Sequence, residues 1–311
     1  MNIWIMHKLV LPVGKEDKMQ KIIVVLGPTG VGKTKMSVEL AKRLDGEIIN
    51  ADSMQIYKKL DIGTAKIREE EKEGIPHYLF DIKNVNENYS IYNYQIDGRN
   101  ILNDIIKRGK TPIIVGGTGL YIKALLYDYN LSFEKENDTY DELSTEELYN
   151  ELIELDSKVD IDKNNRRRII RAINYYKGNN KSISENKTNK LLYDAIFIGL
   201  TTERERLYDI INKRVDVMID NGLLDEVKYF YDNKVYAKPL IGGIGYKELY
   251  KYFDGEISKG EAIDKIKQNS RKYAKRQYTF FKHQLPAEWI NVDFDNFNNT
   301  VNEVLNKLIE L

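Results

Sequence analysis

The sequence predicts an α/β fold in which helices cover both faces of a parallel sheet. Short apolar runs typical of buried parallel strands occur at Ile22–Leu26, Glu47–Asn50, Pro112–Val115 and Ala195–Leu200. Segments with helical spacing of apolar residues, such as Ser90–Lys107 and Glu203–Met218, separate these runs. Buried strands that alternate with helices are typical of a doubly wound core, and we therefore expect this fold class.

The first predicted strand leads directly into a phosphate-binding loop. The eight residues that fit the pattern G-x-x-x-x-G-K-[ST] are Gly27, Pro28, Thr29, Gly30, Val31, Gly32, Lys33 and Thr34. Backbone N–H groups of such a loop can surround a diphosphate, and the following helix points its positive end at the same anion. Lys33 adds a positive charge, and the Thr34 hydroxyl can bind Mg²⁺. We expect a P-loop NTPase-like core, but the loop alone does not distinguish hydrolysis, phosphoryl transfer and displacement of diphosphate.

A carboxylate follows the second predicted strand. Asp52 stands just after Glu47–Asn50, at the strand end where α/β proteins place their ligands, and we expect this strand to lie next to the one that carries the loop. Three roles are open for Asp52 at this point: it can hold Mg²⁺ through water, accept a proton, or cap the next helix.

Composition restricts the function further. The 311 residues contain 48 Lys and Arg and 48 Asp and Glu, so the net charge of zero gives no overall attraction to polyanions. The chain has no cysteine, which excludes disulfides and cysteine-ligated metals and fits a reducing cytoplasm. His7, His77 and His283 are scattered and form no metal-binding pattern. No segment is a membrane-span candidate.

The pattern divides the chain into a core and an insertion. We expect an extension without a catalytic role at 1–18, a P-loop core made of 19–126 and 193–311, and an inserted helical subdomain at 127–192. The last hundred residues look mainly helical. Around 263–282, helical spacing predicts an inward face made of these residues: Ile263, Ile266, Ser270, Ala274, Gln277 and Phe281. The other side of that helix carries its basic residues, which are Lys265, Arg271, Lys272, Lys275, Arg276 and Lys282. They indicate either a solvated face or contact with an RNA backbone.

Several further motifs occur together and in a fixed order. They are GPTGVGKT (27–34), DSMQIYKKLDIGTAK (52–66), HYLFD (77–81), YSIY (89–92), VGGTGLY (115–121), NNRRRIIRA (164–172), RVDVM (214–218), GLLDEV (222–227), GIGYKE (243–248) and AKRQYT (274–279). This set closely resembles the tRNA dimethylallyltransferases, from Met19 to about His283. It is far more specific than the phosphate-binding loop alone.

The resemblance implies transfer of a dimethylallyl group from dimethylallyl diphosphate to the exocyclic amine of an adenosine next to the tRNA anticodon. Asp52 matches the general base of the family, and its carboxylate must approach the amine to about 3 Å. Lys33, Thr34, the loop amides and Mg²⁺ are suited to stabilise the departing diphosphate. Arg214 matches an arginine that reaches the diphosphate, although a surface salt bridge is the alternative.

The resemblance also implies contacts with the tRNA anticodon stem-loop. Ser53, Met54 and Gln55 match the adenine-recognition segment, which requires the base to leave its stack, and Asp52 beside them is also expected to contact the tRNA. Thr118 matches a position near the channel entrance, although its Gly-Gly-Thr-Gly turn alone indicates only backbone geometry. The last match is a run that contacts RNA in the family, and it consists of Arg167, Arg168, Ile169, Ile170 and Arg171. Its arginines could instead pair with the acidic residues that precede the run. The stretch 132–147 departs from the family pattern, so no contact residue is assigned there.

Two other functions compete with this interpretation. A small-molecule phosphotransferase would use the loop, Mg²⁺ and Asp52 on ATP and an acceptor hydroxyl. A nucleotide-gated RNA-binding protein would bind RNA without forming a bond. Neither explains why DSMQIY, GTAK and AKRQYT occur together. We expect a cytoplasmic monomer that acts away from membranes.

Overall fold

The computed structural model describes residues 21–128, 140–183 and 190–311, and its centre is a six-stranded sheet with the order β3-β2-β4-β1-β5-β6. All neighbouring strands are parallel. The strands are β1 (Ile22–Leu26), β2 (Gly46–Asn50), β3 (His77–Tyr78), β4 (Thr111–Val115), β5 (Ala195–Thr201) and β6 (Ala287–Asn291). The predicted α/β fold class and its four strands are confirmed to within one residue at each end.

The edge strands β3 and β6 were not predicted from the sequence. Two residues make β3, too few to produce a pattern. Along β6 only Ile290 is fully buried, so the strand lacks the continuous apolar run of a central parallel strand. The expectation that the last hundred residues are mainly helical is correct except for β6.

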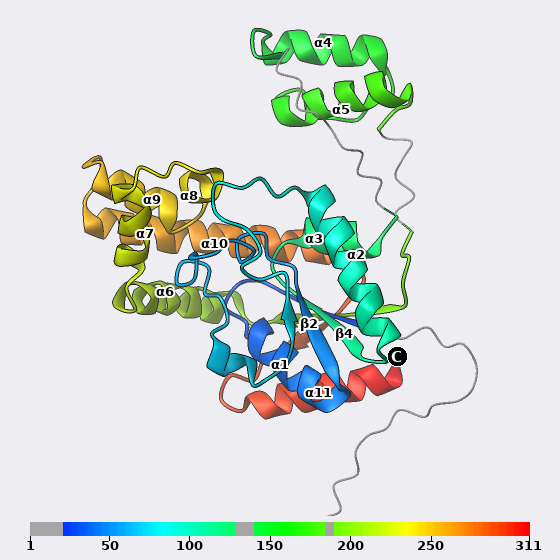
Figure 1. The fold of residues 1–311 in the computed structure, drawn as a ribbon, viewed down its shortest axis with the longest axis vertical. Helices are drawn as coiled ribbons and strands as arrows, with labels where there is room; N and C mark the ends of the chain where they lie inside the picture. Colours follow the sequence, from blue (N-terminus) through cyan, green and yellow to red (C-terminus); the bar gives the residue numbers. More distant parts are fainter. Residues whose placement is uncertain (1–20, 129–139, 184–189) are drawn as a thin grey trace, which may run out of the picture.

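Helices cover both faces of the sheet (Figure 1). Alternate residues of each strand point to opposite faces. On one face, Ile23 and Val25 of β1 pack with α1 (Lys33–Leu44) and α11 (Phe297–Glu310). On the other face, Ile22 and Val24 pack with α2 (Ile91–Lys107) and α3 (Gly119–Leu126). The apolar runs are continuous because both faces are buried.

Between β5 and β6, five helices build a third core cluster. They are α6 (Arg204–Asp220), α7 (Leu223–Asp232), α8 (Lys238–Gly242), α9 (Tyr246–Phe253) and α10 (Lys259–Gln284). The predicted inward face of α10 is confirmed for Ile266, Ala274, Gln277 and Phe281, which are buried, while Ile263 and Ser270 are half-buried. The basic residues of the other side are exposed except Arg271, which is half-buried and donates to Asn212 Oδ1.

The helices α4 (Thr145–Leu155) and α5 (Arg166–Asn179) form a pair with a separate apolar core. Figure 1 shows this pair apart from the sheet. The chain leaves the core after α3 and returns before β5, and Tyr127 forms an antiparallel bridge with Leu191 where the two connections pass each other. The predicted extension at 1–18 lies outside the described residues. Within the described ranges, no helix combines the length and apolar character needed to cross a membrane.

Candidate functional site

The site lies where β1, β2 and β4 end. A cavity of about 610 Å³ is lined there by the phosphate-binding loop, by Asp52 and Gln55, and by the turn at Gly116 and Gly117. We expected β2 to lie next to β1, and this is wrong, because β4 separates them. The turn after β4 therefore lies between the loop and Asp52. Its glycines allow this close approach, since a Cβ on Gly116 would lie 2.2 Å from the carbonyl of Ala51.

The phosphate-binding loop has the backbone that the glycine pattern predicts. Gly27 adopts φ +142°, and a Cβ there would lie 2.4 Å from the carbonyl oxygen of Leu200 on β5. Gly32 adopts φ +85° and precedes the first residue of α1. The first turn of α1 has no acidic residue and no side-chain cap. Its free N–H groups are therefore available to an anion. Thr29, Gly30 and Gly32 line the cavity, with Lys33 and Thr34.

Two cations, Lys33 and Arg214, and one carboxylate, Asp52, line the same cavity. Burial, followed by the positive charge of Arg214, lowers the pKa of Lys33 to about 7, and Asp52 opposes this shift. Burial also lowers the pKa of Arg214, against the opposing effect of Asp52. Arg214 lies on α6 and lines the cavity, which argues against the surface salt bridge. The cations are thus desolvated and repel each other, and such a site favours a bound anion.

Asp52 is oriented by a hydrogen-bond network that begins in β2. Its Oδ1 accepts the N–H of Met54 at 2.9 Å, and its own N–H donates to Asn50 Oδ1 at 2.9 Å. The Asn50 amide donates back to the Asp52 carbonyl and to the carbonyl of Leu79. Asp52 Oδ2 lies 3.5 Å from the position that a Cβ on Gly117 would occupy. Sequence reasoning missed Asn50. The signal was an amide at the carboxyl end of a strand predicted to be buried.

Gln277 connects the two loops of the site. Its Oε1 accepts the N–H of Thr29 at 2.9 Å, and its Nε2 donates to the carbonyl of Gly117 at 3.0 Å. The side chain comes from α10 and is buried. We predicted its inward orientation but no role in the site. The signal was available, because a buried amide on an apolar helix face must find polar partners. Tyr273, one turn earlier, also lines the cavity.

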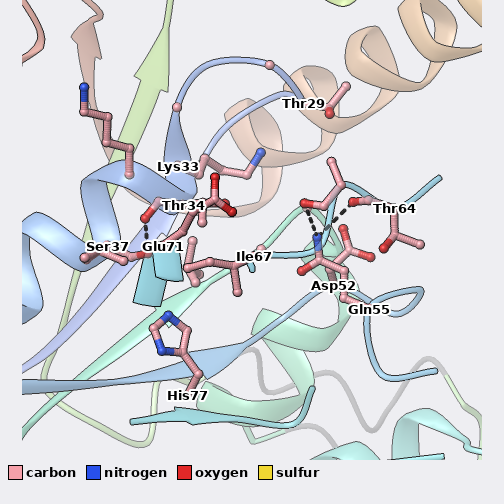
Figure 2. Close-up of a pocket in the computed structure, with 18 of the residues that line it drawn as sticks. Thr29, Lys33, Thr34, Ser37, Asp52, Gln55, Thr64, Ile67, Glu71 and His77 are labelled. Carbon is pink, nitrogen blue, oxygen red and sulfur yellow. Dashed lines mark hydrogen bonds between the residues drawn. The ribbon is translucent and has the colours of Figure 1, made fainter. Parts of the chain in front are cut away.

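The predicted tRNA-binding residues that follow β2 and β4 divide into two groups. Asp52 and Gln55 line the cavity (Figure 2). Ser53, Met54 and Thr118 are not among the lining residues. The Ser53 N–H donates to Thr118 Oγ1 at 3.1 Å, which connects the ends of β2 and β4. Met54 packs against the third core cluster.

The predicted RNA-contacting run forms the first turns of α5. Arg167 and Arg168 are exposed, and Ile170 and Arg171 are half-buried. Ile169 is completely buried among the apolar residues of α4 and α5. The assignment of Ile169 to RNA contact is therefore corrected: its side chain stabilises the helix pair. Arg166 donates to the carbonyls of Tyr140 and Leu143 and fixes the start of α5.

Thr34 is the side chain placed to hold the expected Mg²⁺. It is exposed at the start of α1 and lines the cavity (Figure 2). The described part of the chain contains no group of three or more His, Cys, Asp or Glu side chains that could hold a metal alone. This donor set fits an ion that keeps several waters and takes its other ligands from phosphate oxygens, as Mg²⁺ does.

Comparison with known proteins gives a consistent set of similarities. The family model described as IPP transferase matches residues 55–284. The chain is 52% identical over 296 residues to a tRNA dimethylallyltransferase of Anoxybacillus flavithermus, covering 92% of this chain and 95% of that protein. It is 48% identical over 291 residues to one of Bacillus cytotoxicus, covering 89% and 92%.

Solved structures show the same similarity. A tRNA delta(2)-isopentenylpyrophosphate transferase of Staphylococcus epidermidis is 40% identical with a TM-score of 0.72, covering 94% of this chain and all of the other. A eukaryotic dimethylallyltransferase acting on tRNA is 29% identical with a TM-score of 0.85, covering 94% and 80%.

Proposed function

The chain belongs to the IPP transferase family, and we propose that it transfers a dimethylallyl group from dimethylallyl diphosphate to tRNA. The acceptor is the exocyclic amine of adenosine 37, which follows the anticodon on its 3′ side. One observation carries this proposal: a single cavity is lined by an anion-binding loop, two half-buried cations and a carboxylate. The names of the similar proteins also favour prenyl transfer over the phosphotransferase alternative.

The reaction forms one bond and breaks one. The amine nitrogen attacks the first carbon of the dimethylallyl group, and the carbon–oxygen bond to the diphosphate breaks, so the diphosphate departs with the bonding electron pair. The proton that the nitrogen loses passes to Asp52. Because the adenine ring delocalises the lone pair of the amine, a base at this position assists the attack. Asp52 is suited to this role. Its Oδ1 accepts the Met54 N–H, so the proton can pass to Oδ2.

Lys33 and Arg214 supply the charge that the diphosphate needs. Negative charge accumulates on the leaving group as the carbon–oxygen bond breaks. Preorganised cations therefore stabilise the transition state more than the bound substrate. Both side chains have pKa values lowered by burial. A bound diphosphate would neutralise their mutual repulsion and keep Lys33 protonated. The N–H groups of the loop and of the start of α1 add fixed dipoles aimed at the same oxygens.

Thr34 would hold Mg²⁺ together with diphosphate oxygens. The ion would supply further positive charge to the leaving group when bound. The residues described above still bind and orient the diphosphate by themselves, through the loop amides and the two cations.

The adenine enters from the side of Asp52 and Gln55. A base in a stem-loop must leave its stack to reach a half-buried carboxylate in a cavity, and a glutamine amide can then recognise the base edge. Exposed arginines on α5, notably Arg167 and Arg168, and the exposed basic side of α10 are suited to RNA phosphates. We expect the protein to act as a cytoplasmic monomer.

Mass spectrometry of an adenine-rich anticodon stem-loop tests the proposal. The stem-loop is incubated with the protein, Mg²⁺ and dimethylallyl diphosphate, and in parallel with ATP in place of the diphosphate. We expect a dimethylallyl adduct on one adenosine in the first reaction and no change in the second. Phosphorylation by ATP without any prenyl adduct would favour the phosphotransferase.

A further inference from the structure

We propose that Glu226 is a positioning residue for adenine recognition, although it lies outside the cavity. It orders the backbone of residues 61–65, called here the 61–65 loop, and this loop in turn holds Gln55 at the cavity wall. The inference rests on the proposed function and extends it to a residue of α7 that does not line the cavity.

The Glu226 carboxylate collects four hydrogen bonds. Oε2 accepts the N–H groups of Asp61 at 3.0 Å and Ile62 at 2.7 Å. Oε1 accepts the N–H of Gly63 at 3.0 Å and the hydroxyl of Tyr246 at 2.6 Å. Three successive backbone N–H groups thus converge on one carboxylate, which is the geometry of a backbone anion nest. The Glu226 carboxylate occupies this nest in place of a bound anion.

Tyr246 fixes the same carboxylate from the other side. It begins α9, is fully buried, and stacks so closely on the loop that a Cβ on Gly63 would lie 2.6 Å from its ring. Burial, and then the charge of Glu226, raise the pKa of Tyr246, so its hydroxyl remains a donor. Only glycine at 63 lets the loop approach this ring while its N–H reaches Glu226.

The loop carries this constraint to Gln55. Its far end supplies two acceptors to the Gln55 side chain, the carbonyl oxygen of Thr64 at 3.0 Å from Nε2 and that of Ala65 at 3.5 Å. The Thr64 hydroxyl is bonded back to the Leu60 carbonyl, and the Ala65 N–H to the Ile62 carbonyl. The loop is therefore a closed turn that is held together by its own hydrogen bonds. Figure 2 shows Gln55 and Thr64 joined at the cavity.

This arrangement determines which end of the Gln55 amide can recognise the base. The amide nitrogen faces the loop carbonyls, so the oxygen is left as the acceptor for a hydrogen on the adenine. If the loop loses its anchor, the carbonyls shift, and the amide is free to rotate and present either end. The reaction then loses orientation of the acceptor amine, while the diphosphate side of the cavity is untouched.

A carboxylate is required at position 226, and this makes the inference testable. Glu226→Gln preserves the size of the side chain but turns one acceptor oxygen into an NH₂ group that faces N–H or O–H donors. Asp225→Asn is the matched control, since Asp225 is the exposed acid next to it on the same helix turn. Tyr246→Phe removes one of the four donors and keeps the ring, as a milder second variant.

The experiment is a double-mutant cycle between Glu226→Gln and Gln55→Ala, read as prenyl transfer to the stem-loop. Because hydrogen bonds to a charged group are involved, we expect Glu226→Gln alone to lower kcat/KM for the stem-loop by about 10-fold to 100-fold. In the Gln55→Ala background the same change should cost less than about threefold. Tyr246→Phe should follow the same pattern with a smaller loss, and Asp225→Asn should behave as wild type.

Affinity for dimethylallyl diphosphate, measured by calorimetry, separates positioning from general damage to the fold. We expect it to be unchanged in both Glu226→Gln and Tyr246→Phe. An equal loss from Glu226→Gln with and without Gln55 would overturn the inference, and so would a parallel loss of diphosphate affinity. Absence of prenyl transfer by the wild-type protein would instead contradict the proposed function.

Discussion

Replacing Gln277 by methionine should separate the two loops of the site without emptying the space between them. Methionine is similar in size and flexible, so the space between α10 and the loops stays filled. The change removes the acceptor of the Thr29 N–H and the donor to the Gly117 carbonyl. Because these loops carry the diphosphate site and the turn beside Asp52, both stability and transfer should respond.

The expected loss follows from the burial of the two partners. The bond to the Gly117 carbonyl is buried, and an unsatisfied buried acceptor costs about 1–3 kcal/mol. The Thr29 N–H is part-buried and its residue lines the cavity, where water can replace Gln277, so it adds only about 0.5–1 kcal/mol. We expect the free energy of unfolding to fall by about 1.5–4 kcal/mol. Displaced loops should lower kcat/KM by about 10-fold to 100-fold.

Urea unfolding and steady-state transfer to the stem-loop measure these two losses. Gln268→Met is the control, since Gln268 is an exposed glutamine on the same helix. It should change the free energy of unfolding by less than about 0.5 kcal/mol and leave transfer intact. If Gln277→Met and Gln268→Met unfold at the same urea concentration and transfer at the same rate, Gln277 does not connect the loops functionally.

Three further predictions concern the charges. Asp52→Asn should lower single-turnover transfer by about 10²-fold to 10⁴-fold while dimethylallyl diphosphate still binds, and near-normal turnover would exclude the general-base role. Because the pKa of Lys33 lies at about 7 and a bound diphosphate raises it, binding takes up a proton above pH 7. Calorimetry should therefore show an affinity that is nearly constant below pH 7 and falls by up to about tenfold per pH unit above it. This extra fall should vanish in Lys33→Met, and an identical pH profile in that variant would contradict it. Changing Arg167 and Arg168 together to Ala should weaken RNA binding and reduce the salt slope of log K by about 2, and unchanged binding at moderate salt would remove them from the RNA site.

The core of the fold was predictable because its signals are local. Continuous apolar runs mark strands buried on both faces, and the glycines of the loop reflect positive φ angles at Gly30 and Gly32. Sheet order is a non-local property. Nothing in the run Pro112–Val115 indicates that it separates β1 from β2, so we placed Asp52 one strand too close to the loop.

The site was predictable where a motif carries the chemistry and not where support comes from elsewhere. Lys33, Asp52 and Arg214 were identified and do line one cavity. Asn50, Gln277 and Glu226 were missed, because their hydrogen bonds exist only in the folded chain. The partners of Gln277 and Glu226 lie 248 and 164 residues away in the sequence, and Asn50 bonds to Asp52 only because the chain turns after β2. The burial of Ile169 followed from α5 packing on α4, which the charge pattern of the run did not reveal.

Coupling between diphosphate release and prenylation of the stem-loop tests the central claim most directly, because one cavity must serve both substrates. Diphosphate and modified adenosine are quantified from the same reaction, with and without the stem-loop. We predict equal amounts of both products and no diphosphate release without RNA. Diphosphate release that is independent of the stem-loop, or that exceeds the modified adenosine, would contradict transfer between substrates bound in this cavity.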